Sequence, residues 1–594
     1  MSEDELEPIL ASLLRKDFLT VQADPRSPER GNYGFLQALV QRIAHDTLSR
    51  KERKTRHLAV ARHLEESWGT DEAEIVEVIA SHYLDAYRAE PEAADAEEIQ
   101  GQAREALRRA GRRAASVAAM QEARRYFEQA AELAEREPRV QAELLEDAGV
   151  MADAGRDGGV AVALFERAIQ LYATQELTHP AARVEARLAQ TLWGEGQIGT
   201  AAERMQRSYE VLREDEPDED LAMLAAQLGR FLWFTGRTEE AEQPIEFALE
   251  IAESLRLPEV LSEALNTKSL MRTTGGRKEE ALALLRHALE LALEHDLTSA
   301  ALRAYFNLAY RAAGRDRWDE STEINQQGLE LARRRGDRGW EQAFMSHLRG
   351  DRTMLGQWDE VIPSEEELAD VSRADVTQGG LDILATGVMI NLHRGRLEEA
   401  KRIVSHFPPE PSAEIQERAA YGLVRASLAR AEGRPSETVA AAEEVFERLA
   451  ELGTEHPVLK LVFVEELEAA FDLGDLDVVE RRLRWFRDLR PADRWPFLEA
   501  QAERFRARLA AARGEAEEVE RGFKRGAALL REIGARFWLA VVLLEYGEWL
   551  AQAGRTDEAA PLLEEARETF ERLEAKPWLE RLDALGAQRT LTEV

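Results

Sequence analysis

The amino-acid sequence predicts an all-α protein, in which helical hairpins stack into a right-handed superhelix that follows a small N-terminal module. A short signature, Gly-x-x-x-Glu-Ala or a close relative of it, recurs about every 40 residues along most of the chain. On both sides of each copy, apolar residues recur three and four positions apart, which is the spacing of an amphipathic helix. A hairpin of this size cannot bury its apolar stripe alone, so neighbouring hairpins must stack.

The signature divides the chain into about twelve repeats of two helices each. The third residue of each copy serves as a marker, and a further copy, AAMQEA around Met120, precedes the first marker. The glycine suits the left-handed position that ends a helix, and the acidic pair after it suits the positive end of the next helix. We therefore predict a solenoid over residues 116–594, with markers at residues 157, 198, 238, 278, 318, 358, 397, 435, 476, 516 and 556.

Small residues recur where the two helices of a hairpin must approach each other. Gly229 and Ser269 lie in first helices, and Ala241, Ala281 and Ala400 lie near the starts of second helices. Together with the glycine-led turn, this pattern resembles tetratricopeptide repeats over residues ~100–594. The repeat is about six residues longer than the usual unit, like the longer variant of bacterial regulatory ATPases.

The tetratricopeptide resemblance implies that the first helices line a concave groove that holds a protein or peptide. The two tryptophans in the predicted set have an alternative role, which is to fill the packing between repeats. No row of Lys and Asn recurs in the first helices, which disfavours binding of a chaperone tail. By position, the groove would present Arg183, Gln190, Trp193, Arg230, Trp233, Asn266 and Thr273.

The first 64 residues have a different sequence pattern from the repeats and predict a winged-helix-like module. The segment DELEPILASLLRK predicts a helix, FLTVQA with the turn DPRSPERGN predicts a β-hairpin, and YGFLQALVQRIAHDTL predicts a second helix. The segment SRKERKTRHLAVARHLEES follows as a basic helix, and residues 65–115 form a helical connector to the solenoid.

This N-terminal run, with the pair His82 and Tyr83, closely resembles a junction in bacterial STAND-type (AAA-like) ATPases, including those fused to class III adenylate or guanylate cyclases. The resemblance spans residues ~5–130 and implies a role in signalling. The chain contains no Gly-Lys dipeptide and therefore no P-loop, and no segment resembles a cyclase. One alternative is thus a regulatory C-terminal part of an ATPase or cyclase system whose catalytic domains lie on an upstream chain.

A basic run in the N-terminal segment predicts either a nucleic-acid patch or a docking face within the chain. The full chain has 78 Lys+Arg and 113 Asp+Glu, a net charge of −35 that repels nucleic acid. Docking is therefore the preferred interpretation, and a DNA-binding transcriptional regulator is the alternative. The run comprises Arg50, Lys51, Arg53, Lys54, Arg56 and Arg62.

No pattern in the sequence indicates catalysis, a cofactor or a bound metal. The chain has no cysteine, which excludes thiol nucleophiles and thiolate metal sites, and it lacks H-E-x-x-H and G-x-S-x-G. The segment GEGQIG matches a dinucleotide fingerprint, but it lies between two predicted helices instead of after a strand. We expect a non-catalytic cytoplasmic scaffold or sensor in bacterial signal transduction that binds a protein or peptide, with neither membrane nor cofactor.

Overall fold

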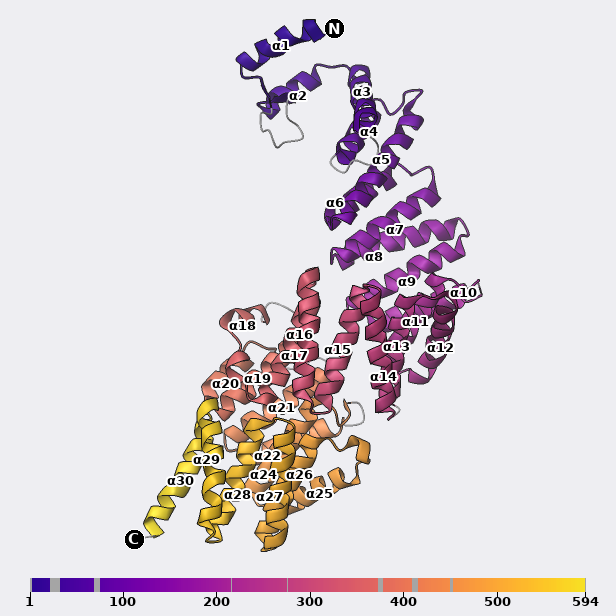
Figure 1. Ribbon diagram of the computed structural model, residues 1–594. Coiled ribbons are helices and arrows are strands. Elements are labelled where there is room, and N and C mark those ends of the chain that lie inside the picture. The colour runs from indigo at the N-terminus through magenta and orange to yellow at the C-terminus, as the bar shows by residue number, and fades with distance from the viewer. Residues whose placement is uncertain are drawn as a thin grey trace. The chain divides into compact units, whose positions relative to one another are not determined.

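The computed structural model describes residues 3–21, 33–68, 75–214, 216–274, 276–371, 378–408, 415–448 and 452–592. It divides into two compact units, unit 1 at Met1–Ile251 and unit 2 at Ala252–Val594. Nearly all regular structure in the described residues is helical, which confirms the predicted all-α repeat fold (Figure 1).

Unit 1 opens with a helix and a two-stranded antiparallel sheet. Helix α1 covers Glu3–Arg15, and strand β1 (Leu19–Val21) pairs with β2 (Tyr33–Phe35). The predicted hairpin is confirmed, but its turn lies outside the described residues. The prediction that a helix starts at Tyr33 was wrong, because Tyr33–Phe35 pair as a strand and Gln37 is still extended before α2 (Ala38–Asp46). The winged helix itself stays a prediction.

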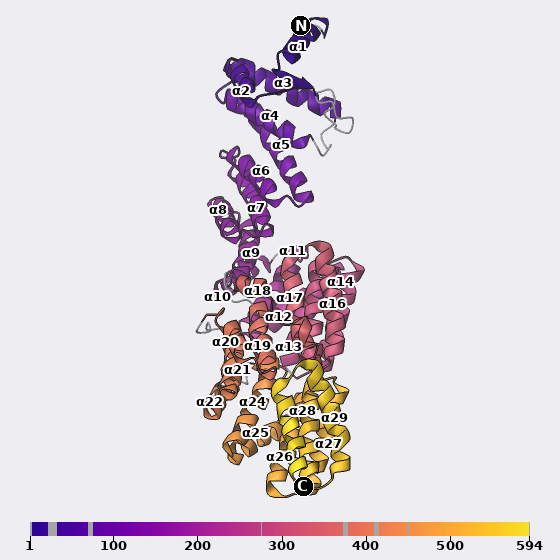
Figure 2. The same cartoon turned by 90° about the vertical axis from the view of Figure 1, so that its left-hand side faces the viewer.

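The rest of unit 1 consists of helices that follow one another as stacked hairpins (Figure 2). The basic helix α3 runs to Trp68, so the domain boundary predicted after residue 64 falls inside a helix. The predicted boundaries of the module, the connector and the solenoid stay predictions. The helices are α3 (Arg50–Trp68), α4 (Val76–Ala89), α5 (Ala96–Ser116), α6 (Met120–Glu132), α7 (Pro138–Ala154), α8 (Gly158–Thr174), α9 (Thr178–Gly194), α10 (Ile198–Leu212), α11 (Glu219–Phe234) and α12 (Thr238–Leu255), the last of which ends in unit 2.

Unit 2 continues the same two-helix repeat. One repeat is irregular, because the marker at residue 358 begins the single turn η1 (Trp358–Glu360) instead of a full helix. The helices are α13 (Pro258–Thr274), α14 (Lys278–Glu294), α15 (Thr298–Gly314), α16 (Trp318–Arg335), α17 (Arg338–Leu355), α18 (Glu365–Val371), α19 (Gln378–His393), α20 (Leu397–Val404), α21 (Ile415–Ala431), α22 (Pro435–Phe446), α24 (Pro457–Leu473), α25 (Leu476–Asp488), α26 (Pro496–Arg513), α27 (Ala516–Glu532), α28 (Arg536–Gln552), α29 (Thr556–Leu573) and α30 (Lys576–Thr592), with a second single turn η2 (Pro491–Asp493).

The marker residues locate the second helices closely. Apart from the marker at residue 358, each one is the first residue of a second helix or directly precedes it. The turns before them use the left-handed backbone conformation, with φ of 79° at Gly236 and 75° at Gly356. The signature therefore encodes the end of one helix and the start of the next.

Close contact between the paired helices depends on small residues, as predicted. A Cβ atom built on Gly229 of α11 would lie 2.4 Å from Cγ1 of Ile245 in α12. The side chains of Ala241, Ala281 and Ala400 are buried. Each hairpin is thus packed too tightly at these positions for a larger side chain.

Unit 2 also folds back on itself after about four repeats. The buried Lys460 of α24 forms an ion pair with Asp316 and donates to the backbone oxygen of Gly314 at 2.7 Å. Trp318 packs against Phe497, and Trp358 packs against Phe537 with ring centroids 4.9 Å apart. The hairpins that these tryptophans join are far apart in sequence.

A second set of contacts joins the C-terminal helices to the middle of unit 2. Arg394 Nε donates to the backbone oxygen of Leu573 at 2.9 Å, and Arg396 pairs with Glu574 at 2.6 Å. Helix α30 also contacts α19 (Figure 1). Successive turns of the superhelix in unit 2 are therefore bonded to each other.

Candidate protein-binding surface

The first helices α9 and α11 of unit 1 carry five of the seven side chains predicted to line a groove. Gln190 of α9 donates a hydrogen bond to Gln227 of α11, and the indole of Trp193 stacks on Phe231 at 4.1 Å. These contacts bring Gln190 and Trp193 to the seam between two consecutive repeats. Arg183 lies in the same helix, and Arg230 and Trp233 lie on α11.

The aromatic residues at this seam have both a packing role and an exposed edge. Trp193 is half-buried, which agrees with the alternative that it fills the space between repeats. Beside it, the Phe234 ring is 50% exposed and lies 5.5 Å from the Trp193 ring and 4.7 Å from the Trp233 ring. An apolar ring in this position is accessible to a partner.

Two arginines and a glutamate lie together on the neighbouring part of this face. Glu146 of α7 lies 3.3 Å from Nε of Arg187 and 3.8 Å from Nε of Arg183. Its side chain is only 12% exposed, whereas those of Arg183 and Arg187 are 44% and 43% exposed. Burial raises the pKa of Glu146, although both arginines oppose that shift. The accessible guanidinium groups of Arg183 and Arg187 therefore both contact the largely buried carboxyl group of Glu146.

Arg230 carries a charge that the described part of the chain leaves without an ion pair. Its guanidinium carbon lies 5.8 Å from the centroid of the Phe234 ring. Burial lowers the pKa of Arg230 to about 10, and no nearby carboxylate offsets that effect. The side chain is still protonated at neutral pH, so a desolvated cation stands next to an exposed aromatic ring.

The other two predicted groove residues, Asn266 and Thr273, belong to α13 of unit 2. Asn266 is 2% exposed and accepts a hydrogen bond of 2.6 Å from Asn307 of α15. The prediction that Asn266 faces a partner was wrong, because its amide joins two neighbouring helices. Thr273 donates to the backbone oxygen of Ser269 in its own helix at 3.0 Å.

Three side chains of the surface were missed by the sequence interpretation. They are Arg187, Gln227 and Phe234. Arg187 follows Arg183 by one helical turn, and Gln227 occupies the position 40 residues after Arg187. The helical period and the repeat length together would have located both.

The basic run of α3 is partly neutralised within the chain. Lys54 forms ion pairs with Glu90 at 3.0 Å and Asp95 at 2.8 Å, and these contacts raise its pKa. Arg53 lies 4.0 Å from Asp46. The side chains of Arg50, Lys51, Arg56 and Arg62 are exposed. The contacts of Lys54 favour the docking interpretation over nucleic-acid binding.

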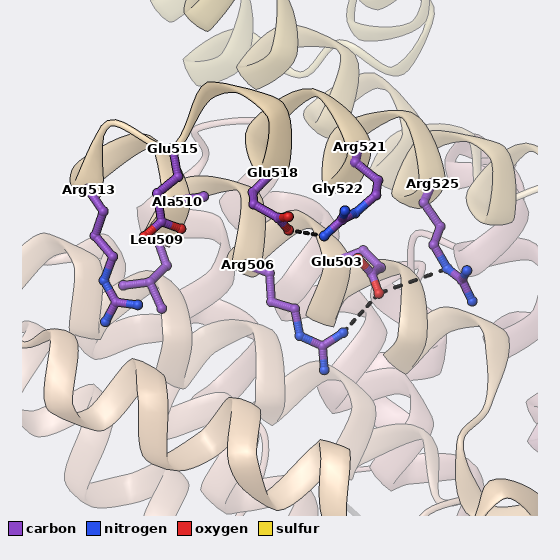
Figure 3. A pocket seen from close by; sticks show the side chains of 10 residues that line it. All are labelled: Glu503, Arg506, Leu509, Ala510, Arg513, Glu515, Glu518, Arg521, Gly522 and Arg525. Carbon is purple, nitrogen blue, oxygen red and sulfur yellow. Dashed lines mark hydrogen bonds and ion pairs between the residues drawn. The ribbon is translucent and has the colours of Figure 1, made fainter.

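A pocket of about 380 Å³ between α26 and α27 is rich in arginine but has no charge to spare (Figure 3). Arg506 pairs with Glu503 at 2.8 Å, and Arg521 pairs with Glu518. Arg525 is also joined to Glu503, at 3.9 Å. Because glutamates neutralise these cations, the pocket has little positive charge left to attract an anionic ligand.

A second pocket of about 550 Å³ lies beside α21 and α22. Its floor includes the apolar side chains of Val424, Leu428 and Val445, and Arg425 at the pocket pairs with Glu444. It adjoins the short second helices α20 and α22.

The described residues contain neither a metal site nor a membrane-spanning helix. No group of three or more His, Asp or Glu side chains in these residues could hold a metal ion. No helix in the described part of the chain is long and apolar enough to cross a membrane.

Comparison with known proteins gives structural likeness only. No family model matches the chain, and no curated protein matches it. The Cut9–Hcn1 complex is 13% identical and has a TM-score of 0.43, covering 81% of this chain and 93% of that one. A Rap protein complexed with competence and sporulation factor is 12% identical, with a TM-score of 0.38, and covers 67% and 99%. Aspartyl phosphate phosphatase F from Bacillus subtilis is 13% identical, with a TM-score of 0.37, and covers 60% and 92%.

Proposed function

We propose that this protein is a non-catalytic scaffold that binds a protein or peptide along α9 and α11 of unit 1. The observation that carries the proposal is the unpaired Arg230 beside the exposed ring of Phe234. A half-buried guanidinium group without a counter-ion gains most from a ligand that brings a carboxylate. An aromatic ring at the same place adds apolar contact area.

Charge on this face points to an acidic partner. Arg183 and Arg187 both contact the carboxyl group of Glu146, and Arg230 adds a further positive charge. The whole chain carries a net charge of −35, so a cationic region of this kind stands out against its surroundings. Complementary charges would orient an acidic segment with aromatic or aliphatic residues onto this surface. A role in bacterial signal transduction, as sensor or scaffold, follows from the resemblance of the N-terminal run.

The proposal is tested by charge reversal at one position on a first helix and one position on a second helix of unit 1. Arg230→Glu places a carboxylate within the proposed surface, and Arg207→Glu makes the same change on an exposed residue of the second helix α10. The full chain and both variants are used to recover partners from a cell lysate, followed by mass spectrometry. We expect Arg230→Glu to lose partners that Arg207→Glu retains.

Partners that survive Arg230→Glu, with helical content unchanged by circular dichroism, would show that binding occurs elsewhere. Equal loss with both variants would indicate an effect of total charge instead of a defined surface. Arg183→Glu serves as a second variant within the surface, since its exposed side chain tolerates substitution better than that of Arg230.

A further inference from the structure

Three histidines from three successive helices meet at the N-terminal end of unit 1. His45 lies on α2, His57 on α3 and His82 on α4. Nδ1 of His57 is 2.9 Å from Nδ1 of His82, and Nε2 of His57 is 3.5 Å from Nε2 of His45. His57 therefore contacts another imidazole through each of its two ring nitrogens.

Such a chain of rings limits how many protons it can hold. A hydrogen bond between two imidazole nitrogens needs one proton, supplied by one ring and accepted by the other. With all three rings neutral, each contact can hold one proton. A first extra proton makes His57 a donor at both nitrogens, while His45 and His82 accept. A second extra proton on His82 or His45 would set two N–H groups against each other.

The charged groups around the cluster come from the same three helices. Asp46 of α2 lies 3.6 Å from Nδ1 of His45 and 4.0 Å from Arg53 of α3. Asp85 of α4 favours the charged forms of His57 and His82, whereas Arg53 opposes a charge on His57. Burial lowers the pKa of both His57 and His82, so these two rings are mostly uncharged near neutral pH.

The two contacts of His57 cross interfaces of unequal strength. Between α3 and α4, Leu58, Ala61 and Ile79 are buried, and Tyr83 Oη donates to Glu65 at 2.7 Å. Helix α2, in contrast, buries none of its side chains. Among the described residues, its polar contacts with α3 are the His45–His57 pair and the long Asp46–Arg53 ion pair. Repulsion within the cluster would therefore separate α2 before it separates α3 from α4.

We propose that His45, His57 and His82 form a proton-operated latch, which holds α2 on α3 while the cluster is uncharged and releases α2 when the cluster takes up two extra protons. Released α2 is only nine residues long, and a helix of that length is marginal in water. Release therefore unfolds α2 and frees the hairpin attached to it. Because burial lowers the pKa of His57 and His82 from 6.5, the latch opens as the pH falls below that value.

Hydrogen–deuterium exchange of the full chain tests the latch. Peptides that cover residues 38–46 are compared at about pH 7.5 and about pH 5.5 after correction for the intrinsic pH dependence of exchange. We expect several-fold faster corrected exchange of α2 at the lower pH, with α4 unchanged. Equal corrected rates for α2 at the two pH values would overturn the proposal.

Two variants separate the latch from a general effect of acid. Glutamine can occupy the position of a histidine Nε2 without taking up a proton, so His45→Gln should abolish the pH dependence of α2. As a second variant, Asp85→Asn should move the transition to lower pH, because Asp85 favours the charged rings. His287→Asn, at an exposed histidine of α14, is the control and should behave like the wild type. A pH dependence that persists unchanged in both cluster variants would refute the latch.

Discussion

Asp351 shows how a single buried residue makes the fold sensitive to pH. Its side chain in α17 is 2% exposed and accepts hydrogen bonds from Ser321 at 2.7 Å and Asn325 at 3.1 Å. No ion pair joins it to a cation among the described residues. Burial raises its pKa to about 7, against the lowering effect of the two hydrogen bonds, and Asp382 and Asp319 add to the rise.

We predict that Asp351→Asn stabilises the protein in weakly alkaline solution. A carboxyl group whose pKa is higher in the folded state favours folding fully below the unfolded pKa of 3.8, and this contribution is lost as the pH rises through about 7. The neutral amide avoids the cost of a buried charge, which is on the order of 2–4 kcal/mol. Urea unfolding midpoints should differ at about pH 8 and converge near pH 4. A variant less stable than wild type at about pH 8 would contradict this account.

At the scale of helices, the contact between α11 and α12 depends on the absence of a side chain at Gly229. The space that a Cβ atom would need is occupied by Ile245, at 2.4 Å and 2.6 Å from two of its carbon atoms. We predict that Gly229→Ala destabilises unit 1 by about 1–3 kcal/mol, because one of the helices must shift.

Gly101→Ala provides the matched control for Gly229→Ala in the same unit. Gly101 lies within α5, and nothing lies within 4 Å of the Cβ atom that would be added. This variant should be stabilised by up to ~1 kcal/mol, since alanine is the better helix former. Thermal unfolding followed by circular dichroism measures both changes, and equal effects of the two substitutions would refute the packing argument.

Helices and hairpins were the part of this fold that the sequence could predict. The contacts that define them are local and occur again in each repeat. The same sequence pattern therefore marks each turn, and small residues such as Gly229 and Ala241 occupy equivalent positions in successive repeats. The exception is Trp358, which begins only a single turn although the signature is present there. At this turn, Trp358 packs against Phe537, 179 residues later in the chain.

The candidate surface was predictable to the same extent. Helical spacing located Arg183, Gln190 and Arg230 on first helices, and the structure joins Gln190 to the next repeat. Whether a side chain in such a position is exposed or buried depends on its neighbours. For that reason Asn266, in an equivalent part of α13, proved to be buried against Asn307.

At the scale of the whole molecule, contacts between distant repeats restrict the movements that are open to unit 2. Lys460 and Asp316 are 144 residues apart in sequence and form a buried ion pair, and Arg394 reaches the backbone of Leu573. These contacts hold successive turns of the superhelix together and resist a change in its curvature. No sequence period marks them, because each residue occurs in a single copy.

We therefore propose that a partner binds on first helices of unit 1, where charged and aromatic groups are accessible, and that the bonded turns of unit 2 have a structural role. The partner recovered with the wild-type protein allows these two roles to be tested without any substitution.

Hydrogen–deuterium exchange of the full chain, with and without that partner, is the most direct test. We predict slower exchange in peptides that cover α9 and α11, including residues 183–194 and 227–234, and little change in α24 to α28. Protection confined to unit 2, with α9 and α11 unaffected, would contradict the central claim that the arginine-rich face of unit 1 binds the partner.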